Sequence, residues 1–72
     1  MNTKVLNQNI RDSIMLTLKQ TVRPIETRAY ARKLARRFHT NIFRVYGVLS
    51  GLTRSNAVHF TVRKMGGPSY IR

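Results

Sequence analysis

The feature that most constrains the fold of this chain is an interruption between two amphipathic segments. From Leu34 to Leu52 the sequence reads LARRFHTNIFRVYGVLSGL, with a helical pattern on each side of His39-Thr40-Asn41. Histidine is among the types enriched in the left-handed conformation, and Thr40 or Asn41 can cap a new helix. The pattern therefore predicts one helix that ends before His39 and another that begins near Asn41. The alternative is a single helix that runs straight through.

The segment before the break, from Arg28 to about Arg37, separates apolar from cationic side chains. Its apolar residues recur at i, i+3, i+4 and i+7, which is the spacing of one helix face. They are Ala31, Leu34, Ala35 and Phe38. The cations occupy the outward side and comprise Arg28, Arg32, Lys33, Arg36 and Arg37. Thr27 is the predicted N-cap of this helix, and Pro24 ends any helix before it. Residues 22–25 fit a very short strand.

The segment after the break, about residues 41–54, is predicted to be a third helix. Its inward residues are Ile42, Val45, Leu49 and Leu52, and its outward residues are Phe43, Arg44, Gly47, Ser50, Gly51 and Arg54. Two glycines in one helix cost about 1 kcal/mol each relative to alanine. Two explanations are open: a bare helix surface that lets another molecule approach closely, or tight packing against a neighbouring helix of the same fold. Asn56 is the expected left-handed residue at the end of this helix.

The two ends of the chain complete an α+β pattern. Residues 4–20 place apolar side chains at intervals of four, namely Leu6, Ile10, Ile14 and Leu18, with Met15 alongside. Val5 and Leu16 project off this face, which favours a deeply packed helix; Leu16 is otherwise a candidate dimer contact. Near the other end, Val58, Phe60 and Val62 alternate with polar residues and predict a strand with one buried face. A turn at residues 65–68 and a second strand at residues 69–71 follow. Four aromatic residues are expected in the core or at its edge: Tyr30, Phe38, Phe60 and Tyr70.

Charge is the strongest indication of the partner. Fourteen Lys and Arg face two acidic residues, Asp12 and Glu26, for a net charge of +12 in 72 residues. A compact fold with this imbalance repels itself and is stabilised by an anionic partner. Six of the cations fall within residues 23–37, so the positive charge is concentrated on one short segment. Duplex nucleic acid carries one negative charge per ~1.7 Å of its axis and is the expected partner, with an anionic membrane surface as the competitor.

Several functional classes are excluded or weakened by what the sequence lacks. No cysteine is present, which excludes disulfides and thiolate metal sites. The two carboxylates fall on different predicted elements, and His39 and His59 have no ligand partners nearby, so we predict neither an enzyme nor a metal or cofactor site. No apolar run approaches the ~20 residues of a membrane span, and the N-terminus lacks a signal-peptide pattern. We therefore expect a soluble, cytoplasmic, single domain over residues 1–72.

The order of predicted elements resembles the winged helix-turn-helix family of DNA-binding domains. The resemblance covers about residues 10–72 and rests on a Thr-led second helix, the Leu34-Ala35 pair, an apolar residue at Ile42, and a basic loop into a hairpin. It implies three helices followed by a C-terminal β-hairpin wing. It also implies that the third helix enters the major groove, with Asn41, Phe43, Arg44, Gly47, Ser50 and Arg54 as groove-facing candidates. The turn lacks the glycine that is common in this motif.

The residues themselves suggest how such a domain would bind. The cations of the second helix, together with Arg63 and Lys64 of the wing, are expected to contact the DNA backbone, which fixes position without reporting sequence. We predict a small DNA-binding protein of prokaryotic, plasmid or viral origin, either a transcriptional regulator or a replication or architectural accessory factor. A homodimer through the first helix would suit it. Two alternatives are an RNA-binding, ribosome-associated protein and a protein-docking inhibitor of a nucleic-acid enzyme.

Overall fold

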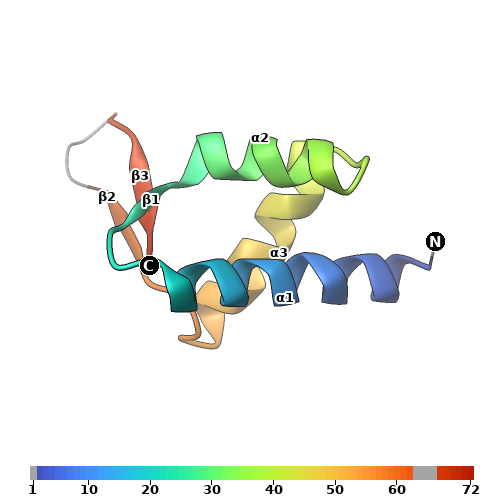
Figure 1. Ribbon diagram of the computed structural model, residues 1–72, viewed down its shortest axis with the longest axis horizontal. Coiled ribbons are helices and arrows are strands. Elements are labelled where there is room, and N and C mark those ends of the chain that lie inside the picture. The colour runs from blue at the N-terminus through green and yellow to red at the C-terminus, as the bar shows by residue number, and fades with distance from the viewer. Residues whose placement is uncertain (1, 63–66) are drawn as a thin grey trace.

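The computed structural model describes residues 2–62 and 67–72 as three helices and a small antiparallel sheet (Figure 1). Along the chain the helices are α1 (Thr3–Gln20), α2 (Thr27–Arg37) and α3 (Ile42–Arg54), and the strands are β1 (Ile25–Glu26), β2 (Phe60–Val62) and β3 (Ser69–Ile71). The α+β class and the three predicted helices are confirmed. None of the helices in this described part is both long and apolar enough to cross a membrane.

The core lies where the three helices and the central strand meet. Ile10 and Ile14 of α1 are fully buried, as are Val45 of α3 and Ile71 of β3. Each such aliphatic side chain contributes roughly 1.5–3 kcal/mol relative to leaving it in water. Leu34 of α2 completes the contact between the helices. The apolar spacing of each helix therefore selects the face that packs inward, and it leaves the cationic face of α2 exposed.

The turn between α2 and α3 is made without glycine. His39 has a φ of 52°, the left-handed conformation predicted for it. Its neighbour Thr40 donates from its backbone N–H to the carbonyl of Ala35 at 2.9 Å, and His39 donates to the carbonyl of Arg36 at 3.2 Å. This pair of bonds is the Schellman arrangement that satisfies the last carbonyls of a helix. The end of α3 repeats it around Asn56, whose φ is 62°. Both predicted left-handed residues are confirmed.

Asn41 begins α3 by accepting a hydrogen bond at its side-chain oxygen from the backbone N–H of Arg44, at 2.9 Å. Asn41→Ala is expected to lower the free energy of unfolding by about 1 kcal/mol, because an N-cap contact of this type contributes about that amount. Asn41→Ser, which retains a capping oxygen, should restore most of the loss. Urea denaturation of the three proteins provides the comparison, and equal stabilities would show that the cap contributes nothing.

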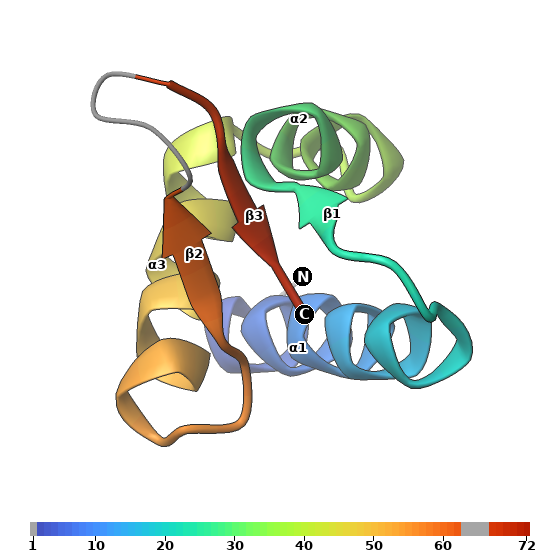
Figure 2. The same cartoon turned by 90° about the vertical axis from the view of Figure 1, so that its left-hand side faces the viewer.

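The sheet places the last strand in the middle, in the order β1-β3-β2. β3 pairs antiparallel with both neighbours: Ile71 lies opposite Ile25 on one side and opposite Phe60 on the other. His59 and Arg72 extend the β2–β3 ladder by exchanging two backbone hydrogen bonds of 2.9 and 3.0 Å. Figure 2 shows β2 beside α3 and β1 leading into α2, so the sheet closes one end of the helical layer.

Three details of the sequence analysis are wrong. Phe60 and Val62 were expected on the buried face of their strand with Val58, but they are 50% and 52% exposed, because only Val58 lies over the core and the strand beyond it runs along the edge of the sheet. α1 is not packed on every side, since Leu16 is 57% exposed and Val5 is also exposed.

The third error concerns the start of α2. Thr27 does not cap this helix; Glu26 stands at the N-cap position and its side chain makes no capping bond. Because Glu26 still pairs with Tyr70 in the sheet, the chain enters the helix directly from an extended residue. Thr27 is then the first helical residue, and its side chain is buried rather than turned back to the helix end.

Candidate nucleic-acid interface

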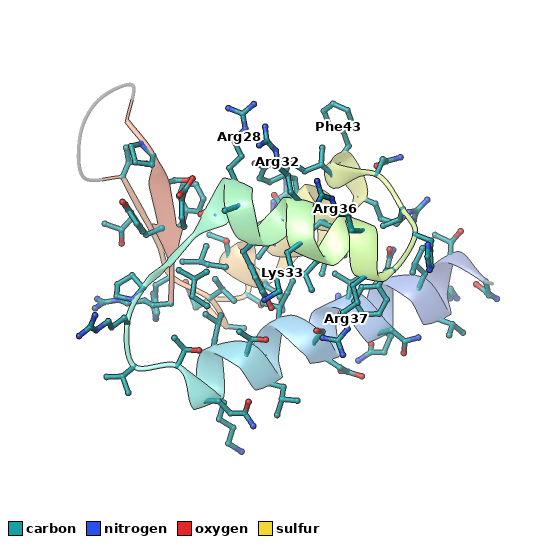
Figure 3. All side chains as sticks on the ribbon, turned by 45° about the horizontal axis from the view of Figure 1, so that its top comes forward. Arg28, Arg32, Lys33, Arg36, Arg37 and Phe43 are labelled. Atoms are coloured by element: carbon teal, nitrogen blue, oxygen red, sulfur yellow. The ribbon has the colours of Figure 1, made fainter. Side chains whose placement is uncertain are left out.

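The five cations of α2 are all exposed and fall into two stripes. Arg28, Arg32 and Arg36 are four residues apart and follow one line along the helix. Lys33 and Arg37 each follow a residue of the first line, so their line lies about 100° further round the helix, which turns by about 100° per residue. In Figure 3, Arg28 and Arg32 project away from α1, on the same side as Phe43, whereas Lys33 and Arg37 lie on the α1 side of α2.

The outward face of α3 has long side chains at its two ends and almost none between them. Phe43, in the first turn, is 80% exposed, and Arg54, the last helical residue, is also exposed. Gly47 and Ser50 lie between them and are exposed as well. The middle of this face therefore has no large side chain, and the helix backbone is accessible there.

The two glycines of α3 do not accommodate a neighbouring helix. A Cβ atom built on Gly47 or on Gly51 would meet no atom of the described chain within 4 Å outside its own helix backbone. Tight internal packing, one of the two explanations considered for them, is thereby contradicted. The helix carries its two least favourable residues on a free surface, where nothing within the described fold compensates for them.

Two of the groove-facing candidates are already engaged within the fold. Asn41 is exposed, but its side-chain oxygen caps α3 and only its amide NH₂ is available for another partner. Arg44 is half-buried and donates from Nη1 to Oδ1 of Asn7 on α1 at 3.3 Å. This contact holds its guanidinium toward α1, away from the centre of the outward face.

The contact between Arg44 and Asn7 borders a hollow of about 530 Å³ between α1 and α3. Phe43 and both glycines line its α3 side, and Arg11 joins Asn7 on the α1 side. Sequence reasoning did not select Asn7 or Arg11. Their four-residue spacing and their position off the apolar stripe of α1 were visible, but only the crossing of α1 and α3 shows that they border the outward face.

The C-terminal hairpin is described in part. Arg63 and Lys64, which were predicted to contact the DNA backbone, lie outside the described residues. On either side of them, β2 exposes both Phe60 and Val62, and β3 begins at Ser69. Figure 2 shows the two strands standing beside α3 at one end of the molecule. Ser50 and Arg54 share a cleft with Phe60, so part of the outward face of α3 adjoins the hairpin.

Comparison of the chain with protein-family models, with characterised proteins and with solved structures found no match. Within residues 2–62 and 67–72, no group of three or more His, Asp or Glu side chains lies close enough together to hold a metal ion.

Proposed function

We propose that this chain is a winged helix-turn-helix protein that binds double-stranded DNA through α3, with α2 and the hairpin on the flanking backbone. It would act in the cytoplasm as a transcriptional regulator or as a replication or architectural accessory factor. The element order α1-β1-α2-α3-β2-β3 supports the fold assignment, as does the placement of β3 between β1 and β2. The short α2–α3 turn at residues 38–41 supports it too.

One observation carries the DNA assignment. Phe43, at the start of the exposed face of α3, projects on the same side of the molecule as Arg28 and Arg32 (Figure 3), and neither α2 nor α3 contains an acidic residue. An α-helix fits the major groove of B-DNA, which is about 12 Å wide. Arginines beside the inserted helix would then lie near the phosphates, whose contacts fix the register of the protein.

The side chains of α3 favour limited sequence readout. Arg54 has the reach and the donors for a bidentate contact to guanine, and Phe43 offers an apolar surface for a thymine methyl group. Gly47 and Ser50 provide little or no side chain for base recognition, but they permit close approach of the helix. We infer a protein whose affinity comes mainly from phosphates and from the fit of α3 in the groove, with base preference confined to the ends of the helix.

A homodimer through α1 would suit this function. Met15 and Leu16 are exposed on α1, and the helix carries three basic residues against Asp12, so two chains would repel each other less there than through their α2 helices. A symmetric pair would place two α3 helices on half-sites about 34 Å apart. Leu16→Glu should then reduce both self-association and cooperative binding to duplex DNA.

The test of the proposal is binding to a random duplex of about 30 base pairs, to a matched RNA duplex and to single-stranded DNA across a salt series. We expect duplex DNA to be preferred, with log K falling linearly with log salt at about −0.9 per phosphate contact. A preference for duplex RNA would identify an RNA-binding protein instead. Weak binding to all three, together with tight binding to an acidic protein, would identify a docking inhibitor.

A further inference from the structure

A second cleft lies on the other flank of α3, between this helix and the hairpin. It measures about 330 Å³, and Tyr46, Leu49 and Phe60 are its apolar and aromatic lining residues. Ser50, Thr53 and Arg54 of α3 supply polar groups at its margin. This volume lies at the lower end of the range for small-molecule sites, and apolar walls with a few polar groups are typical of them.

Thr27 also lines this cleft and is its most unusual member. The residue is only 1% exposed, and its Oγ1 has no hydrogen-bond partner among the described residues. A buried hydroxyl without a partner costs roughly 1–3 kcal/mol. The hydroxyls of Thr17 and Thr53, by contrast, each donate to the carbonyl four residues earlier in their helix. A ligand that brings a polar atom to this unpaired hydroxyl would give it the hydrogen-bond partner it lacks.

We propose that this cleft binds a small aromatic carboxylate. The ring would lie between Tyr46 and Phe60, where an aromatic group packs well against two other aromatic faces or edges. The carboxylate would pair with the Arg54 guanidinium, which favours planar two-oxygen anions. Thr27 Oγ1 would donate its hydrogen bond to one oxygen of the same carboxylate. Phe60, half-exposed on an edge strand, gains a partner when the ligand is present.

The site has a regulatory consequence that rests on the proposed function. Ser50 and Arg54 belong both to this cleft and to the face of α3 proposed to enter the major groove. A ligand that holds Arg54 toward the cleft removes its contact to DNA, and a ring inserted beside Phe60 alters the position of β2 relative to α3. Bound ligand is therefore expected to lower DNA affinity.

The first experiment titrates the full chain with 2-naphthoate and with its neutral analogue 2-naphthamide, followed by amide chemical shifts in two-dimensional NMR spectra. Naphthoate is expected to shift Ser50, Thr53 and Arg54 and to bind at least tenfold more tightly than the amide. Arg54→Gln should remove this tenfold preference. Shifts confined to the exposed α1 surface around Met15 and Leu16, or equal affinity for both compounds, would overturn the proposal.

Thr27→Val separates a ligand-binding role from a structural one. Because the hydroxyl has no partner in the described fold, valine should raise the melting temperature, whereas it should weaken naphthoate binding about tenfold. A lower melting temperature with unchanged naphthoate affinity would overturn the assignment of Thr27. Val22→Asn, which alters a fully exposed apolar residue outside the cleft, is the control and should leave naphthoate binding unchanged.

Competition against duplex DNA completes the test. Naphthoate should lower the DNA affinity of the original chain and have little effect on the Thr27→Val chain. Naphthoate binding with no effect on DNA affinity would overturn the regulatory link. If the chain binds no duplex at all, the DNA proposal fails while the naphthoate titration still decides whether the cleft is a ligand site.

Discussion

Replacing Arg28 and Arg32 together by alanine is expected to weaken binding to duplex DNA about 60-fold at ~0.1 M monovalent salt. Each of the two lost phosphate contacts contributes about 0.9 to the slope of log K against log salt. Relative to ~1 M salt, the two together therefore account for about 1.8 in log K at ~0.1 M. The slope itself should become less steep by about 1.8. Both side chains are exposed and project on the same side of the molecule as Phe43 of α3, so their loss should not disturb the core. Fluorescence anisotropy across a salt series measures both quantities.

Lys33→Ala/Arg37→Ala is the matched control for this experiment. It also removes two positive charges from α2, but these belong to the stripe on the α1 side (Figure 3). A general attraction between a polycation and DNA would make the two double variants equally weak. A specific interface predicts that the control loses several-fold less affinity. If the control proves the weaker binder, α2 contacts the duplex through its other stripe and the proposed orientation of α3 is wrong.

Gly47→Leu is expected to stabilise the folded chain while it weakens binding to DNA by at least tenfold. Leucine is among the better helix-forming residues and glycine costs about 1 kcal/mol in a helix interior. No described atom lies within 4 Å of the new Cβ, so most of this gain should be realised. For a domain of this size, 1 kcal/mol corresponds to a rise of roughly 4–8 °C in melting temperature. The added side chain would occupy the middle of the α3 face that is proposed to enter the groove.

Gly47→Ala provides the graded comparison. Both variants should be stabilised to a similar extent, because alanine and leucine have similar helix propensities. Their DNA affinities should instead decrease in the order glycine, alanine, leucine, because that order follows the volume placed between the helix and the groove. Thermal melts and DNA titrations on the same preparations decide the matter. Unchanged affinity in the leucine variant would show that the exposed glycine surface does not face DNA.

Local features of this fold could be predicted from the sequence because they depend on neighbouring residues. Helical periodicity places Ile10 and Ile14 inward, and the types of residue at His39 and Asn56 allow the left-handed conformation that ends each helix. The capping role of Asn41 depends on a backbone N–H only three residues away. Each of these interactions is complete within about one turn of chain.

Features that depend on distant partners could not be predicted in the same way. Asn7 and Arg44 are 37 positions apart, so the contact that holds Arg44 toward α1 has no local signal. The environment of Thr27 depends on how α3 and the hairpin pack over the start of α2, and a threonine before a helix ordinarily suggests a cap. Phe60 satisfies the alternating pattern of a half-buried strand, but its exposure is decided by the edge position of β2.

The central position of β3 has a consequence for the order of events during synthesis. β1 and β2 do not pair with each other. Both pair with β3, whose residues emerge after Pro68. The helices can form as they leave the ribosome, but Ile25 meets Ile71 only when 46 further residues have followed it (71 − 25 = 46). The sheet and the last part of the core therefore form together, once residues 69–71 are available to pair with both neighbouring strands. Deletion of residues 69–71 would remove the partner of β1 and of β2 at once and leave three helices without a sheet.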